Sequence, residues 1–128
     1  MSFNVLQTIP VLRIFDVEKA KTFYVGFLGF IVDWEHTFEA KFPVYMQVSR
    51  GNCLFHLSEH HGDGSPGANV FIRMTGLDDF HKEVTGKNYK FMKPGLEKTF
   101  HGTKCMGVID PFGNHINFNE DVKTETAG

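Results

Sequence analysis

The sequence predicts an α+β fold made of two tandem β-α-β-β-β modules, and three observations support this prediction. In each half, one helix-type pattern follows a strand-type run and precedes further strand-type runs. A segment rich in Gly, Pro, Ser and Asp, residues 60–67, separates the halves. Sliding the chain by 60 residues lays Val11–Ile14 over Phe71–Met74. We therefore expect one domain over residues 1–128, with modules at about 1–59 and 68–120, a linker at 60–67 and a flexible tail at 121–128.

The first half begins with a β-rich run at Val5–Leu12, and Asp16 then stands as an N-cap before a helix. The residues of one helical stripe are apolar, and Gly29 is placed to end the helix in the left-handed conformation. A tight turn at Gly51 and Asn52 joins the last two strands. The three strands expected after the helix are Phe30–Glu35, Val44–Arg50 and Cys53–Ser58.

The second half repeats this order. A strand at Asn69–Thr75 precedes a helix at Leu77–Lys87, whose apolar residues fall on one stripe. Asn88 takes the place that Gly29 has in the first half, and these two residue types tolerate a left-handed cap best. The remaining strands are expected near Tyr89–Met92, Thr103–Ile109 and His115–Asn119.

The composition excludes several classes of partner. A net charge of -2 and 15 acidic against 13 basic residues argue against a nucleic-acid surface. Cys53 and Cys105 lie in apolar runs without C-x-x-C spacing, which favours reduced thiols and a cytoplasmic location. No export signal and no stretch of about 18 apolar residues is present, so no membrane partner is expected.

Three segments resemble a known family: Ile9–Glu35, Tyr45–His60 and Ile109–Glu120, the last with a D-P-x-G-N turn. The chain resembles the vicinal oxygen chelate superfamily, and within it the glyoxalase/bleomycin resistance protein family, closest to the bleomycin resistance proteins. The resemblance runs over almost the whole chain. It implies that the two modules form a concave mixed sheet, the glyoxalase/bleomycin resistance/dioxygenase fold, in which the enzymes hold a metal.

A metal site is the first hypothesis to weigh, because Leu54–Asp63 is dense in His, Glu and Asp. The resemblance places four metal ligands at Ile9, His56, Asn69 and Asn117, of which only His56 is a good ligand. Strand alternation leaves the other cluster members past the end of the strand, in a loop where solvated or capping roles are common. His115 shares the face of Asn117 and would be a second imidazole, but a two-His site also needs a carboxylate, and none is found on that face. We expect no metal and no other cofactor.

The resemblance implies instead a binding protein that sequesters a bleomycin-like cationic glycopeptide or a similar flat aromatic ligand in the crevice of a homodimer. Carboxylates would meet the positive tail, and aromatic side chains would stack on flat rings. Trp34 is either such a stacking residue or a core residue between sheet and helix. No catalytic residue is expected; Asp33 and Glu35 would share a strand face as a solvated pair. The candidate ligand-binding residues are Asp33, Trp34, Phe38, His56, Ser58, Phe71, Arg73, Phe100, His101 and Asn117.

Other functions remain open at this stage. His101 stands where the resemblance implies a stacking Trp in the drug-binding proteins, and a smaller ring at this position weakens the resemblance to them. A metal-dependent glyoxalase- or dioxygenase-type enzyme of the same fold is the main alternative to a binding protein, and a sensor for another small molecule is a further one. Pro10, within the first expected strand, favours an edge or a strand that crosses to a partner in the homodimer.

Overall fold

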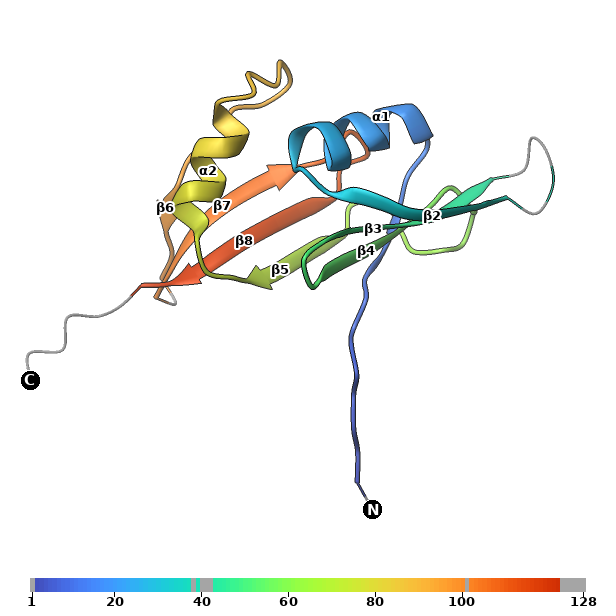
Figure 1. Ribbon diagram of the computed structural model, residues 1–128, viewed down its shortest axis with the longest axis horizontal. Helices are drawn as coiled ribbons and strands as arrows, with labels where there is room; N and C mark the ends of the chain where they lie inside the picture. The colour runs from blue at the N-terminus through green and yellow to red at the C-terminus, as the bar shows by residue number, and fades with distance from the viewer. Residues whose placement is uncertain (1, 38, 40–42, 101, 123–128) are drawn as a thin grey trace, which may run out of the picture. The chain divides into compact units, whose positions relative to one another are not determined.

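The structure is a computed structural model that describes residues 2–37, 39, 43–100 and 102–122 (Figure 1). The chain divides into two compact units, Met1–Ala68 and Asn69–Gly128. Each unit holds one four-stranded sheet. In the described part of the chain, no helix is long and apolar enough to cross a membrane.

The first unit contains one helical segment and a mixed sheet. Its strands follow the order β1-β4-β3-β2, in which β1 runs parallel to β4 and the other neighbours are antiparallel. The helical segment covers one face of this sheet (Figure 1). The elements are β1 (Val11–Arg13), α1 (Val17–Lys21), η1 (Thr22–Phe27), β2 (Ile31–Thr37), β3 (Val44–Arg50) and β4 (Cys53–Ser58).

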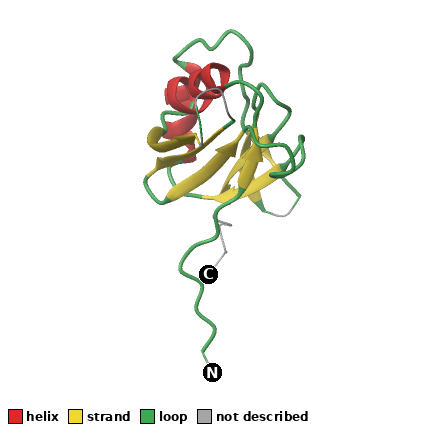
Figure 2. Cartoon of the chain, turned by 90° about the vertical axis from the view of Figure 1, so that its right-hand side faces the viewer, coloured by secondary structure: helices red, strands yellow, loops and turns green. Residues whose placement is uncertain are grey.

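The predicted bounds of β3 and β4 are confirmed, whereas β1 and β2 begin later than expected. Residues 2–10 form no strand, and the N-terminal segment extends away from the strands as a loop (Figure 2). Pairing with β4 starts only where the carbonyl of Pro10 accepts the His56 amide at 3.0 Å, so Pro10 precedes the strand instead of lying within it. The Phe30 amide donates to the Tyr24 carbonyl at 2.9 Å, which keeps Phe30 in the helix exit and out of β2.

The helical segment begins as predicted, because the Asp16 side chain accepts the Lys19 amide at 2.9 Å. After Lys21 it widens into a π-helical stretch, in which the Leu28 amide reaches back five residues to the Phe23 carbonyl at 2.9 Å. Gly29, at φ 78°, ends the segment as expected. The buried side chains of this segment are Ala20, Phe23, Tyr24, Phe27 and Leu28.

These side chains pack on the inner residues of β3 and β4. Phe55 contacts Tyr24 with ring centroids 5.9 Å apart and stacks on Phe30 at 5.3 Å. Met46, Val48 and Leu57 are buried on the same face of the sheet. Burial of apolar side chains of this size stabilises the unit by roughly 1.5–3 kcal/mol each. The opposite face of the sheet is left for polar and aromatic side chains.

The second unit repeats this topology, with the strand order β5-β8-β7-β6. As in the first unit, its first and last strands are parallel neighbours. Leu77, Phe80 and Val84 are buried on the predicted stripe of α2. The predicted α+β fold of two repeated modules is therefore confirmed. The elements are β5 (Asn69–Arg73), α2 (Leu77–Thr85), β6 (Glu97–Lys98), β7 (Thr103–Ile109) and β8 (His115–Asp121).

One predicted strand is wrong. Tyr89–Met92 forms turns, and the strand at this place in the repeat is the two-residue β6. Pro94 has no amide hydrogen to donate, and its carbonyl accepts from His81 Nε2 at 2.8 Å, which ties the loop to α2. Asn88 at φ 53° has the left-handed conformation predicted from its match to Gly29. At the other end, β8 continues to Asp121, one residue into the expected tail.

Two polar clusters fix the ends of β8. Before the strand, the buried Asp110 carboxylate accepts the amides of Phe112 and Asn114 and the Asn114 side chain, which gives the D-P-x-G-N turn its shape. Within the strand, the Glu120 carboxylate accepts the Gly76 amide at 3.2 Å and the Leu77 amide at 3.0 Å. Glu120 thus caps α2, whose N-cap residue Gly76 has no side chain to do so.

Replacing the cap gives a direct test of this tie between β8 and α2. Glu120→Gln removes the negative charge at the helix N-terminus, and we expect a loss of about 1 kcal/mol in the free energy of unfolding. The matched control is Glu83→Gln, whose carboxylate lies 3.7 Å from Lys87 Nζ in a partly exposed pair, and it should cost less than about 0.5 kcal/mol. Urea unfolding measures both; equal losses would contradict the capping role.

Candidate functional site

A β-bulge at Asp33 shapes the open face of the first unit. Val32 pairs with Val48, but the next pair joins Trp34 to Gln47, so β2 has one residue more than β3 at this point. Side chains alternate between the faces of a strand, and an extra residue reverses the alternation that follows it. Trp34 is thereby placed on the open face, away from the helix.

The bulge also separates Asp33 from Glu35, which the sequence predicts to share a face. The Asp33 side chain accepts from Gln47 on the open face at 3.0 Å. Glu35 pairs with Met46, which lies on the core face of the sheet, and the Glu35 carboxylate lies 3.0 Å from Lys21 Nζ of α1. The expectation of a shared face is therefore wrong, and only Asp33 belongs to the open face.

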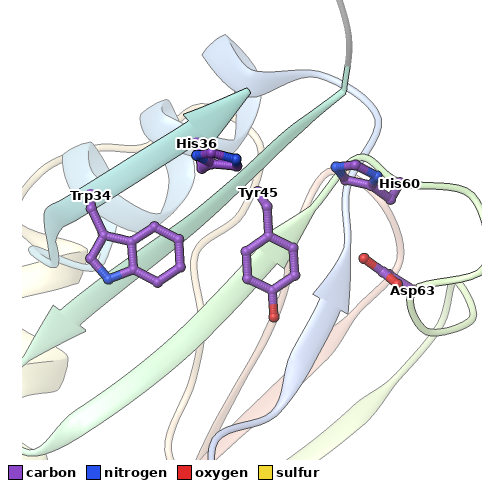
Figure 3. Close-up of a pocket in the computed structure, with 5 residues that line it drawn as sticks. All are labelled: Trp34, His36, Tyr45, His60 and Asp63. Carbon is purple, nitrogen blue, oxygen red and sulfur yellow. The ribbon is translucent and has the colours of Figure 1, made fainter. Parts of the chain in front are cut away.

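Cross-strand pairing brings the open-face residues together in rows. Trp34, Gln47 and His56 are direct neighbours across β2, β3 and β4. The next row joins His36 to Tyr45. An open pocket of about 460 Å³ lies over these rows (Figure 3). Its lining consists of Trp34, His36, Tyr45, His60 and Asp63.

Trp34 and Tyr45 form a flat aromatic surface in this pocket. Their ring centroids are 5.9 Å apart and the ring planes differ by 10° (Figure 3). The His56 ring meets both edge-on, at 5.4 Å from Trp34 and 5.2 Å from Tyr45. Trp34 is 42% exposed. Of the two positions predicted for Trp34, the core and the open face, the structure shows the open face. The Trp34–Tyr45 shelf formed in this way can receive a flat ring.

A chain of hydrogen bonds runs beneath the shelf. Tyr45 Oη lies 2.7 Å from His56 Nδ1, and His56 Nε2 lies 3.0 Å from Gln47 Oε1. The Gln47 amide nitrogen then donates to Asp33 at 3.0 Å. Both ring nitrogens of His56 are therefore engaged by protein groups.

The electrostatics of these groups follow from their surroundings. Hydrogen bonds from Gln47 and then Ser49 lower the pKa of Asp33, which stays a carboxylate. Burial lowers the pKa of His56, which favours the neutral ring. Burial, and then the nearby Asp63 carboxylate, raise the pKa of Tyr45, so its hydroxyl keeps its proton.

The loop after β4, expected to be a solvated linker, contributes part of the pocket. The Ser58 hydroxyl donates to Asp63 at 2.9 Å and accepts the His60 amide at 3.0 Å. Glu59 accepts the Val44 amide at 3.0 Å and so fastens the loop to β3. Ser58 is fully buried, so this predicted ligand-binding residue supports the pocket wall instead of lining it.

These residues do not fit a transition metal. His56 would have to give up its bond to Gln47 or Tyr45 to coordinate one, and Ile9 offers no donor atom. The described residues contain no group of three or more His, Cys, Asp or Glu side chains arranged to hold a metal. In the second unit, Asn117 Nδ2 donates to Asn69 Oδ1, which ties two of the places implied by the resemblance to each other.

The remaining predicted site residues belong to the second unit or lie outside the described residues. Phe71 on β5 is 53% exposed, and Phe100 is fully exposed. Arg73 Nη2 lies 3.3 Å from the Asp121 carboxylate in an exposed ion pair. Phe38 and His101 lie outside the described residues.

Sequence reasoning missed Tyr45 and Gln47, and also His36 of the pocket lining, and it weighed the loop residues His60 and Asp63 only as metal ligands. A signal for the first two was present, since Val44–Arg50 alternates apolar residues with Tyr45, Gln47 and Ser49. The tight turn between β3 and β4 also fixes Gln47 opposite His56. The loop residues have no periodicity from which their placement could be read.

Comparison with known proteins identifies the family. Residues 2–125 match the family described as glyoxalase superfamily protein. The chain belongs to the glyoxalase superfamily. This confirms the resemblance drawn from the sequence, and the match covers both units. No curated protein matches the chain.

Solved structures of this superfamily share the fold. A bleomycin-binding protein complexed with bleomycin has a TM-score of 0.72 and 18% identity over 92% of this chain and 100% of its own. The bleomycin-binding protein of Streptomyces verticillus, complexed with copper(II)-bleomycin, has a TM-score of 0.68 and 26% identity over 94% and 100%. A glyoxalase-related enzyme from Clostridium phytofermentans has a TM-score of 0.72 and 19% identity, over 94% of this chain and 98% of its own. Binding proteins and a glyoxalase-related enzyme thus share this fold.

The lowered pKa of His56 predicts a pH dependence of stability. The neutral ring is favoured in the folded protein, whereas the unfolded chain takes up its proton near the ordinary value of 6.5. The contribution of His56 to the free energy of unfolding is therefore fully present above pH 6.5. It is lost as the pH falls from there through the folded-state pKa.

Two measurements check this expectation. NMR titration should place the folded-state pKa of His56 below 6.5. In urea unfolding, the stability difference between wild type and His56→Gln, which cannot titrate at this position, should shrink as the pH falls. A His56 titration at or above the ordinary value would contradict the burial argument.

Proposed function

We propose that this protein is a binding protein that sequesters a flat aromatic, cationic ligand of the bleomycin type, and that it needs no metal to do so. The observation that carries the proposal is the Trp34–Tyr45 shelf, in which Trp34 is 42% exposed, Tyr45 is half-buried and the two rings are nearly parallel. Aromatic surfaces of this kind bind flat rings by stacking and by burial of apolar area.

The charges around the shelf suit a cationic ligand. Asp63 lines the same pocket as Trp34 and Tyr45, and a carboxylate attracts a positive group there. His56 stays neutral because its pKa is lowered, so it adds no opposing positive charge beneath the rings. Asp63 lines this pocket whereas Asp33 does not, and Asp63 therefore replaces Asp33 as the carboxylate we assign to the ligand.

Two comparisons support the proposal at the level of the fold. The bleomycin-binding proteins that resemble this chain were solved with bleomycin or its copper(II) complex. The enzyme alternative has less support, because His56 is held by two hydrogen bonds and the described residues present no metal-binding group. A role in antibiotic resistance, a homodimer and a cytoplasmic location stay predictions; light scattering at micromolar concentration tests the dimer.

Titration with metal-free and copper-loaded bleomycin tests the function, with Trp34 fluorescence as the signal. Binding should quench the fluorescence, because Trp34 is the only Trp in the chain and would lie against the ligand. Trp34→Ala should weaken binding, measured by calorimetry, by about 1–3 kcal/mol while the fold is kept.

The matched control is Phe3→Ala, which removes an aromatic side chain that is 92% exposed and lies outside the pocket lining. It should leave the affinity unchanged. If neither form of bleomycin binds at high protein concentration, sequestration of this drug class is refuted. If Trp34→Ala unfolds the protein, Trp34 is part of the core and the shelf is not the binding surface.

A further inference from the structure

The hydrogen-bond chain beneath the shelf has a direction, and Asp33 sets it. An ionised carboxylate only accepts hydrogen bonds, so the side chain of Gln47 must turn its NH₂ group toward Asp33. The carbonyl oxygen of Gln47 is then directed at His56 Nε2, 3.0 Å away. A carbonyl oxygen also only accepts, so Nε2 carries the proton of the neutral His56 ring.

The direction continues to the pocket. With the proton on Nε2, His56 Nδ1 has a lone pair and accepts the hydroxyl hydrogen of Tyr45 across 2.7 Å. The Tyr45 hydrogen is thus directed beneath the shelf, toward His56. Tyr45 is one of the residues that line the pocket, and a hydroxyl that donates its hydrogen keeps oxygen lone pairs with which it can accept.

We propose that Asp33 is a positioning residue that acts through Gln47 and His56 to make the Tyr45 hydroxyl a hydrogen-bond acceptor toward the pocket. The site then selects flat ligands that carry a hydrogen-bond donor over flat ligands that carry only an acceptor. The ligand part of this inference rests on the proposed function, whereas the direction of the hydrogen-bond chain does not.

The pocket lining includes one carboxylate, that of Asp63. It is a second acceptor, held in place by the Ser58 hydroxyl at 2.9 Å. Burial and Asp63 both raise the pKa of Tyr45, so the hydroxyl keeps the proton that the chain requires.

The tautomer of His56 tests the direction without any ligand. Long-range ¹H–¹⁵N correlation spectra distinguish the protonated ring nitrogen from the unprotonated one. In the wild type we expect Nε2 protonated and Nδ1 unprotonated. Asp33→Lys puts a group that only donates beside Gln47, so the amide should turn round and the His56 proton should move to Nδ1.

The control is Glu35→Lys, which makes the same change in net charge on the same strand, but at a side chain that pairs with Lys21 of α1. It should leave the tautomer unchanged. A wild-type ring protonated at Nδ1 overturns the inference even if Asp33→Lys does not fold. An unchanged tautomer in folded Asp33→Lys, or the same shift in Glu35→Lys, overturns the role of Asp33.

Two uncharged probes of similar size test the selectivity. Indole offers only a donor and quinoline only an acceptor, and both are neutral at mildly alkaline pH. In chemical-shift titrations of Tyr45 and His56, wild type should bind indole about fivefold more tightly than quinoline. Asp33→Lys should lose or reverse this preference, and Glu35→Lys should keep it.

The outcomes separate this inference from the proposed function. Equal binding of the probes, or no shift with either, overturns the selectivity. Failure to bind bleomycin, together with a donor preference toward the probes, would refute only the drug class. Bleomycin binding with a wild-type His56 protonated at Nδ1 would refute only the positioning role of Asp33.

Discussion

The extra residue that Asp33 inserts into β2 determines which side chains form the pocket. Without it, Trp34 would follow the alternation of Val32 and point toward the core side of the sheet. With it, Trp34 reaches the row of Gln47 and His56, and Glu35 turns to Lys21 on the helix side. Bulges are known to redirect side chains near functional sites, and here a single one creates the aromatic shelf.

The polar groups beneath the shelf follow from the same register. Asp33 is close enough to engage Gln47 because the bulge holds it on the open face, and Gln47 is opposite His56 because a tight turn fixes the hairpin of β3 and β4. Burial favours the neutral ring of His56, and protein groups occupy both of its ring nitrogens. This arrangement suits recognition by stacking and directed hydrogen bonds. It does not suit coordination of a metal, for which an imidazole needs a free lone pair.

The sequence was sufficient to predict the fold and part of the site. The repeat of Val11–Ile14 at Phe71–Met74 led to the duplicated topology, since both copies obey the same periodicities. The bulge could not be predicted, because the alternation of Asp33 and Glu35 reads as an ordinary strand with both carboxylates on one face. The roles of His60 and Asp63 depend on hydrogen bonds to Ser58 and on the path of a loop, which no periodic pattern encodes.

Membership of the glyoxalase superfamily accounts for the architecture, whereas the function depends on which side chains the bulge presents. The most direct test is therefore the position of the Trp34 indole, measured by nuclear Overhauser effects in the wild-type protein. The account predicts contacts from the indole to the rings of Tyr45 and His56, whose centroids lie 5.9 Å and 5.4 Å away. Contacts from the indole to Met46 and Val48 in place of these would show that β2 has no bulge at Asp33, and would contradict the account.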